Sequence, residues 1–388
     1  MRCQNRPAKG RDSRLCQGCR SRRGCEQDIV SIHRAQRPSM RKVPLLTRVL
    51  CKVHERGMEV FHMITETTED RLFHRIGILG MGRMALGLAI DLALKGYGVD
   101  MIDLKQRSEE QRIEYEDALK DECRAAVRLL DGTLDAFPFP AYLDGPGTGV
   151  YDVIFEGLPE EIPTKQRAFS RLGKGIGKET LICSMTSTFT VEELTRGIDP
   201  PLNILVTHFM NPPYLIPFLE VVPHPKMDQE LVDRLFGFLR RIGHMPIRCK
   251  SSPGFVISRL QLCLMNEAVR IMAEGVASPE DIDKAITYGW GYRFPIMGIL
   301  EFVDVGGLEI LYHAGRSVSE ELDRPDLACP TLIEERFREG AIGTKALRGI
   351  FHYESHEKVK KKDLKRLKKQ VRLRTLLDAI HREEGAWM

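Results

Sequence analysis

Short apolar runs alternate with amphipathic stretches over the first half of the ordered sequence, beginning near His74. The predicted strands are the runs at 76–79, 98–104, 152–155, 180–184 and 203–207. Helical spacing of apolar residues fills the intervals at 85–96, 106–130, 163–173 and 190–196. Strands that alternate with helices in this rhythm predict an α/β fold with a doubly wound parallel sheet of the Rossmann type.

The pattern changes near Ser252, after which apolar residues recur at three- and four-residue intervals. Helices are predicted at 254–275, 278–291, 298–322 and 330–340. The second of these begins with Ser278 as N-cap and Pro279 at the first helical position. The predicted domains are therefore a Rossmann domain at 71–250 and a mainly α-helical C-terminal domain at 251–353. Residues 354–388 form a basic amphipathic helix, which we interpret as a solvated helix packed by its Leu/Val stripe; the alternative is a membrane or nucleic-acid contact.

Charge separates an N-terminal leader, residues 1–70, from the rest of the chain. Up to Arg56 there are 15 Lys and Arg against four acidic residues, whereas the remainder has 43 basic and 50 acidic residues. The leader is predicted to be disordered. It is a tail upstream of a start at Met58 or Met63, a targeting segment, or a zinc site at Cys16, Cys19 and Cys25.

The acidic body gives no reason to expect nucleic-acid binding, and no apolar run approaches the ~20 residues that span a bilayer. The body's cysteines are scattered singly at 123, 183, 249, 263 and 329, as in proteins of a reducing compartment, and we expect a cytoplasmic protein. No metal site is predicted in the body.

A nucleotide-binding motif follows the first strand. Gly80-x-Gly82-x-x-Ala85 opens a helix, so that Gly80 permits the tight turn and Gly82 lets a pyrophosphate approach the backbone amides. Asp103 ends the second strand, where a carboxylate accepts hydrogen bonds from ribose hydroxyls and disfavours a 2′-phosphate. We therefore predict NAD as cofactor, held by the turn Gly80, Met81, Gly82, Arg83 and Met84 and by Asp103; the alternative is a strand–helix turn that binds no nucleotide.

His208 ends a predicted strand, and Glu220 lies on the next strand-like run. Oxidation of a secondary alcohol needs a base for the hydroxyl proton, and imidazole suits that role near neutral pH. A carboxylate on the other ring nitrogen would fix its tautomer. Without the nucleotide motif upstream, a structural role for this His–Glu pair would be the better interpretation.

Several motifs resemble the 3-hydroxyacyl-CoA dehydrogenase family in order and spacing, from about residue 74 to 353. They are Gly80-x-Gly82 and the segments ICSMTSTFTVEEL, HFMNPPYLIPFLEVV, SPGFVISRL and GVASPEDIDKAI. The resemblance implies NAD, a small-molecule substrate, a homodimer formed through the C-terminal domain, and a setting in fatty acid metabolism. It also implies that His208 is the catalytic base, Glu220 its partner, Ser187 a donor to the substrate oxygen, and Glu160 and Lys165 cofactor contacts. Lys165 could instead be a solvated helix lysine.

The sequence departs from the family where the catalytic asparagine is expected, because Ser258 stands there and Asn266 lies too far along the helix. The segment between Asp103 and Glu160 is also shorter than the arm of the CoA-dependent enzymes. The substrate is therefore a 3-hydroxyacyl-CoA, a related 3-hydroxy acid, or a small non-CoA compound. The last would place the chain in the branch that includes 5-formyl-3-hydroxy-2-methylpyridine 4-carboxylate 5-dehydrogenase. In that case Trp290, Tyr292 and Arg293 could line the pocket, or the aromatics could be core residues. A cofactor-binding protein without turnover is the remaining alternative.

Overall fold

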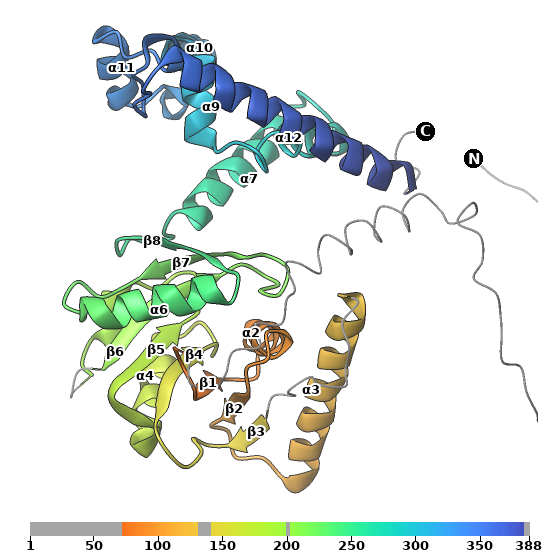
Figure 1. The fold of residues 1–388 in the computed structure, drawn as a ribbon, viewed down its shortest axis with the longest axis vertical. Coiled ribbons are helices and arrows are strands. Elements are labelled where there is room, and N and C mark those ends of the chain that lie inside the picture. The colour runs from red at the N-terminus through yellow and green to blue at the C-terminus, as the bar shows by residue number, and fades with distance from the viewer. Residues whose placement is uncertain (1–71, 131–140, 199–201, 384–388) are drawn as a thin grey trace, which may run out of the picture. The chain divides into compact units, whose positions relative to one another are not determined.

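The structure is a computed structural model that describes residues 72–130, 141–198 and 202–383. The predicted leader, with its cysteine motif and its candidate start methionines, lies outside the described residues. The described strands form one eight-stranded sheet in the order β3-β2-β1-β4-β5-β6-β7-β8 (Figure 1). Their bounds are β1 Ile76–Leu79, β2 Val99–Asp103, β3 Ala141–Asp144, β4 Tyr151–Glu156, β5 Ile176–Ser184, β6 Asn203–Phe209, β7 Phe218–Val222 and β8 Met245–Arg248.

The doubly wound parallel sheet is confirmed for β1 to β6, which pair in parallel throughout. Strand β7 instead pairs antiparallel with β6, and β8 runs parallel with β7. Residues 210–217 between β6 and β7 are too few for a crossover helix, so a hairpin connection is the one available. The helices of this part are α2 Arg83–Leu94, α3 Glu109–Leu129, α4 Ile162–Arg171, α5 Val191–Thr195 and α6 Gln229–Arg241.

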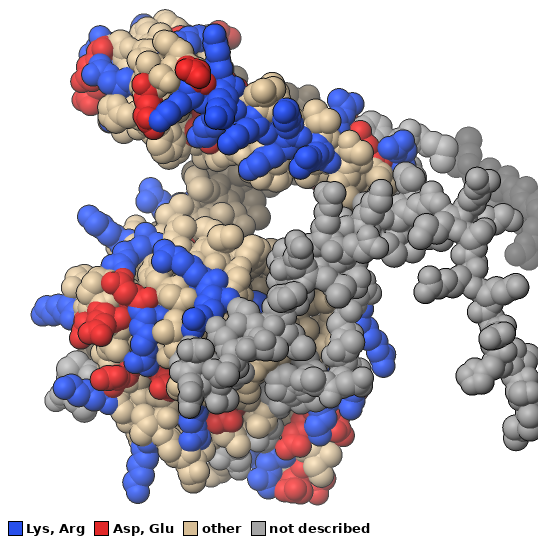
Figure 2. Space-filling view, in the orientation of Figure 1, with Lys and Arg blue, Asp and Glu red and all other residues tan. Residues whose placement is uncertain are grey.

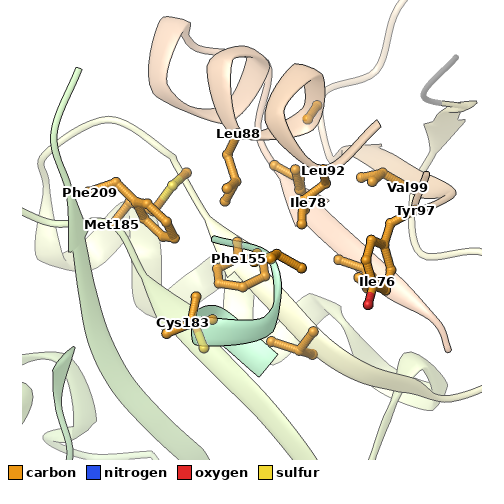
Figure 3. Packing of buried hydrophobic residues seen from close by; sticks show 14 of the residues in the cluster. Ile76, Ile78, Leu88, Leu92, Tyr97, Val99, Phe155, Cys183, Met185 and Phe209 are labelled. Atoms are coloured by element: carbon orange, nitrogen blue, oxygen red, sulfur yellow. The ribbon is translucent and has the colours of Figure 1, made fainter. Parts of the chain in front are cut away.

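Both faces of the sheet are buried, which explains why its central strands are almost wholly apolar. Side chains of one strand alternate between the faces: Ile76 and Ile78 join the cluster beneath α2, and Leu79 joins the cluster on the other face. Figure 3 shows Leu88 and Leu92 of α2 packed over Ile78 and Phe155. The sheet therefore holds α2 and the turn before it in a fixed position.

The order of the strands reverses at β1, because β2 lies on one side of it and β4 on the other. In open α/β sheets, ligands bind at such a switch point, outside the carboxyl ends of the strands. The carboxyl ends of β1, β4 and β5 meet there, and the segments that follow them carry Gly80, Glu160 and Ser187. The topology thus brings the predicted nucleotide and substrate residues to one edge of the sheet.

The helical part begins at α7, as the change of pattern near Ser252 predicts. Its helices are α7 Ile257–Ala273, α8 Pro279–Lys284, which continues into a π-helical segment Ala285–Trp290, α9 Ile299–Gly306, α10 Leu308–Glu321, α11 Thr331–Arg338 and α12 His356–Glu383. The Ser278 side chain caps α8 by accepting from the Asp281 amide. The segment predicted as helical at 298–322 contains two helices, because Gly307 has φ 105° and separates α9 from α10. Both helices continue the same apolar spacing, so the pattern does not reveal the break.

Helix α12 packs through only part of its apolar stripe. Val359, Leu373 and Leu377 are half-buried. Leu364, Leu367 and Val371 are 54–66% exposed. The Tyr292 hydroxyl donates to Asp378, and Gln370 donates to the Tyr292 carbonyl. Figure 2 shows Lys and Arg side chains along α12. Among the described residues, no helix is both long and apolar enough to cross a bilayer.

Candidate active site

The turn between β1 and α2 has the geometry that a dinucleotide needs. Gly80 has φ +108°, and its amide donates to the Ile102 carbonyl at 2.9 Å. Gly82 is the N-cap of α2 and supplies no side chain, so the first amides of the helix stay available to an anion. A Cβ on Gly157, after β4, would lie 3.0 Å from the Ala85 Cβ and 2.6 Å from Met185. Ala85 can therefore replace the third glycine of the motif because Gly157 makes room for it.

Asp103 lies at the end of β2 and is 4% exposed. One carboxylate oxygen accepts the Lys105 amide at 2.9 Å, and the other pairs with the Arg107 guanidinium. The guanidinium in turn lies over the Tyr115 ring, 3.9 Å from its centroid. The Arg107 side chain thus forms an ion pair with Asp103. Lys105 contacts Asp103 through a hydrogen bond from its backbone amide.

A cavity of about 710 Å³ opens at this turn. All eight predicted cofactor residues line it: Gly80, Met81, Gly82, Arg83, Met84, Asp103, Glu160 and Lys165. Arg167 and Arg171 of α4 face the same space, so the cavity also carries positive charge away from Asp103. Its lining suits an elongated ligand with a pyrophosphate.

Lys165 is 1% exposed, so its interpretation as a solvated helix lysine is wrong. Its ammonium lies 2.8 Å from an oxygen of Glu156, which is fully buried at the end of β4, and 3.2 Å from Glu160. Glu160 also accepts from the Thr186 hydroxyl and from the amides of Ser187 and Thr188. Lys165 therefore orders Glu160 and, through it, the loop that carries Ser187.

Glu156 is the buried anion of this network. Its carboxylate also accepts from the Ser184 hydroxyl and the Leu158 amide. Removing one partner of a buried ion pair typically costs about 3–5 kcal/mol of stability, because the other charge is left uncompensated. Burial raises the pKa of Glu160, but hydrogen bonds from Thr186 and the charge of Lys165 outweigh it, and the pKa lies below its ordinary value.

The predicted catalytic pair is assembled by the β6–β7 hairpin. His208 and Glu220 are register partners on the two strands, and His208 Nδ1 lies 2.7 Å from Glu220 Oε2. Glu220 is fully buried and His208 is 7% exposed. The carboxylate can only accept, so Nδ1 carries the hydrogen and Nε2 keeps the lone pair.

The other oxygen of Glu220 binds the first turn of α7. Oε1 accepts from the amides of Val256 at 2.7 Å and Ile257 at 3.0 Å. Burial raises the pKa of Glu220, but the hydrogen bonds from His208 and from these two amides outweigh it, so the pKa is lowered. One ionised carboxylate thus orients the histidine and fixes the start of the helical part.

A second cavity, of about 1100 Å³, contains His208, Ser187 and Ser258. Met84, Met185 and Ser187 line both cavities, so the two spaces adjoin. Asn266 does not line the second cavity, in keeping with its predicted distance. A substrate oxygen bound by His208 and Ser187 in the second cavity would therefore lie close to the first cavity, which the Gly80–Met84 turn lines.

Trp290, Tyr292 and Arg293 line neither of these two cavities. Trp290 packs edge-on against Phe294, with ring centroids 5.1 Å apart. The Arg293 guanidinium lies 4.6 Å from the Phe302 centroid. These contacts connect the π-helical segment to its neighbours, but Trp290 is 40% exposed and Tyr292 half-buried, so neither ring is a buried core residue in the single chain.

The sequence interpretation missed three residues of the site. Asn211, which follows β6 and precedes a cis peptide bond to Pro212, lines the second cavity, and so does Arg259. Both stand inside quoted motifs, next to residues that were singled out. The sequence did not mark Glu156 as a site residue. An acid at the end of an apolar strand suggests an exposed position, and its buried partner, Lys165, is visible only in the structure.

Two family models match the chain. The NAD-binding domain of 3-hydroxyacyl-CoA dehydrogenase matches residues 75–252, and the C-terminal domain of the same enzyme matches residues 254–353. The 5-formyl-3-hydroxy-2-methylpyridine 4-carboxylate 5-dehydrogenase of Mesorhizobium japonicum is 28% identical over 319 residues, covering 79% of this chain and 99% of the relative. The mitochondrial hydroxyacyl-coenzyme A dehydrogenase of Sus scrofa is 26% identical over 293 residues, covering 73% of this chain and 92% of the relative.

A solved structure of a 5-formyl-3-hydroxy-2-methylpyridine 4-carboxylic acid 5-dehydrogenase, described as an NAD⁺-dependent dismutase, is similar in fold. It shares 28% identity at a TM-score of 0.55, covering 79% of this chain and 98% of that structure. The matched models span both the sheet and the helical part, and they include an NAD-binding domain. The chain belongs to the 3-hydroxyacyl-CoA dehydrogenase family and is an NAD-dependent oxidoreductase.

Proposed function

We propose that this chain oxidises the hydroxyl of a 3-hydroxyacyl-CoA or a related 3-hydroxy acid, with His208 as general base. The observation that carries the proposal is the His208–Glu220 pair at 2.7 Å, in a cavity that adjoins the nucleotide turn. The first amides of α2, Asp103 and the loop around Glu160 would hold the dinucleotide. When bound, NAD⁺ supplies the hydride acceptor.

The proton is handled by the chain's own residues. His208 Nε2 takes the hydroxyl proton, and the charge that forms on the ring is stabilised by Glu220 through Nδ1. Ser187 donates to the reacting oxygen, on a loop that Glu160 holds through two backbone amides. Met84 and Met185 form apolar walls where the two cavities adjoin.

Two substrate classes are open to this machinery. The Sus scrofa relative is named for a hydroxyacyl-coenzyme A substrate, which would give this chain a place in fatty acid metabolism. The Mesorhizobium relative is named for a pyridine carboxylate, and a small non-CoA alcohol or aldehyde is therefore the second candidate. We test both with NADH formation over 3-hydroxyacyl-CoAs, free 3-hydroxy acids and pyridine-carboxylate alcohols and aldehydes; no NADH from any of them would support cofactor binding without turnover.

Ser258 is expected to separate the two classes. Ser258→Asn places an amide donor in the first turn of α7, at the wall of the second cavity. If the natural substrate is a CoA thioester, acetoacetyl-CoA reduction should rise by about 10-fold, the gain from one added hydrogen bond of ~1.4 kcal/mol. Steady-state NADH oxidation measures it, and an unchanged rate would favour the non-CoA class.

Asp103 is expected to set the cofactor preference. Asp103→Ala removes the acceptor for ribose hydroxyls, so the Kd for NADH should rise by ~10-fold or more, the scale of a hydrogen bond to a charged group. The same change removes a carboxylate from Arg107, so the Kd for NADPH should fall or stay constant. Fluorescence titration with both nucleotides measures these values, and wild-type protein that binds NADPH as tightly as NADH would contradict the role of Asp103.

We also propose a homodimer through the helical part. Large apolar side chains of α7 are exposed in the single chain, among them Leu260, Leu262, Val269 and Met272 at 43–58%. Exposed apolar patches of this kind usually mark interaction surfaces. Light scattering should give twice the chain mass, and a monomer at micromolar concentration would oppose the proposal.

For the location we propose the cytoplasm, on the basis of cysteine chemistry. Cys123 and Cys183 are single buried thiols, and burial raises the pKa of Cys123 to about 12. Such thiols behave as small apolar core residues and suit a reducing compartment. Cell fractionation with an antibody to the chain tests this, and recovery from an oxidising compartment would oppose it.

A further inference from the structure

We propose that the substrate carries a carboxylate and that Arg259 binds it, an inference that rests on the proposed dehydrogenase function. Arg259 is the third residue of α7, directly after Ser258, and its side chain lines the same cavity as His208 and Ser187. The guanidinium can hold a carboxylate through two parallel hydrogen bonds.

The charge of the cavity favours an anion. Its lining contains no Asp or Glu, and its two basic groups are Arg259 and His208. Among the described residues, no carboxylate lies within ion-pair distance of Arg259, which is exposed to the cavity side of α7. Glu220, the nearest buried acid of the site, is committed to His208 and to the amides of Val256 and Ile257.

The reaction itself gives the anion a role. When His208 accepts the proton it becomes a cation, which Glu220 partly offsets. The guanidinium of Arg259 at the same cavity is a like charge and opposes that step. A substrate carboxylate paired with Arg259 removes the opposition. A neutral substrate leaves both positive charges in the cavity and should therefore react more slowly.

The remaining walls define the rest of the substrate. Met84, Met185, Met210, Ile216, Phe218 and Leu262 provide apolar surface of several shapes. Methionine side chains adapt to irregular apolar groups. The substrate class that fits is a hydroxy acid with a free carboxylate and an apolar body of adaptable shape. The phosphates of a CoA thioester are the other source of negative charge, and the experiment separates the two.

The test compares NADH formation from 3-hydroxybutyrate, 3-hydroxybutyramide and 3-hydroxybutyryl-CoA by the full chain. Wild-type enzyme should prefer the free acid over the amide in kcat/KM. Arg259→Met should lower kcat/KM for the free acid by roughly 10- to 100-fold, the scale of a charge-assisted hydrogen-bonded pair, and change that for the amide by less than about 3-fold. Arg259→Lys should recover part of the loss, because it keeps the charge without the fork.

Two controls keep the outcomes separate. The Kd for NADH should be the same in Arg259→Met and wild type, which checks the fold and the cofactor site. Arg270→Met is the matched variant on the same helix, since Arg270 lies outside the cavity and pairs with Glu267; it should leave all three kcat/KM values unchanged.

Equal losses on acid and amide, or none, would overturn the role of Arg259 while leaving the dehydrogenase proposal intact. A loss confined to 3-hydroxybutyryl-CoA would show that the anion is a CoA phosphate and would overturn the carboxylate. Absence of NADH from all three compounds would contradict the proposed function for these substrates and the inference with it.

Discussion

His208→Ala should reduce kcat by ~10²–10⁴, the usual contribution of a general base. His208 is the one imidazole among the described residues that line the second cavity, and because its Nδ1 is bonded to Glu220, its Nε2 is left for the substrate. Affinity for NADH should change little, because His208 does not line the nucleotide cavity. Stopped-flow measurement of hydride transfer, with NADH titration beside it, separates the two quantities.

His244→Ala is a matched control for this experiment. His244 is a second buried histidine, directly before β8, paired with Asp91 at 2.8 Å and with the Pro217 carbonyl at 3.0 Å, and it lines neither cavity. Its removal should lower stability but spare kcat in the folded fraction. If both variants lose kcat equally, or if His208→Ala keeps wild-type kcat, His208 is not the base.

The sequence predicts the sheet part well because its information is local. The central strands are short apolar runs, and the turn at Gly80 carries its glycine requirement in the motif. The edge strands β3 and β8 are not predicted, because neither is a buried apolar run; β8, with the sequence MPIR, is mostly exposed. The pairing of His208 with Glu220 is also readable, since both flank a connection that is too short for anything but a hairpin. These residues are fixed by neighbours within about a dozen positions.

Features that depend on contacts between residues far apart in the sequence could not be predicted from local patterns. Glu220 accepts from the amide of Val256, 36 positions along the chain, and no local pattern marks such a bond. The exchange of Ala85 for glycine depends on Gly157, in another strand–helix connection. Trp290 and Tyr292 suit a pocket or a core equally well by composition, and the sequence gives no sign that the Tyr292 hydroxyl donates to Asp378, 86 positions away on α12.

The apolar stripe of α12 is a second feature whose contacts the sequence could not predict. Its spacing predicts that the whole stripe is covered, and in the described chain only part of it is: Leu373 and Leu377 are half-buried, whereas Leu367 is 54% exposed. The periodicity of a helix states that a face is apolar but not which molecule it meets. A dimer contact and an exposed face therefore give identical sequence patterns.

Glu220→Gln should lower both kcat and stability, because the carboxylate serves two partners. The amide keeps one acceptor oxygen but turns an NH₂ group either toward His208 Nδ1–H or toward the amides of Val256 and Ile257, and donors then face donors. We expect kcat to fall by ~10²–10⁴, as when the orienting acid of a catalytic triad is neutralised. Stability should fall by about 2–4 kcal/mol at pH 7, for a buried acceptor left with mismatched partners.

The pH dependence of that stability loss identifies its cause. Since the pKa of Glu220 is lowered in the folded chain, the charged carboxylate stabilises the fold above its unfolded pKa, near ~4.3, and this contribution is lost as the pH falls through the folded value. The difference in unfolding free energy between wild type and Glu220→Gln should therefore shrink as the pH falls below about 4.3 toward the folded pKa of Glu220. Urea unfolding at several pH values measures this difference, with Glu230→Gln, an exposed acid on α6, as a variant that should show almost none. If this difference in unfolding free energy stays constant down to pH 3, the charge of Glu220 does not stabilise the fold. The carboxylate of Glu220 would then not anchor the helical part to the sheet.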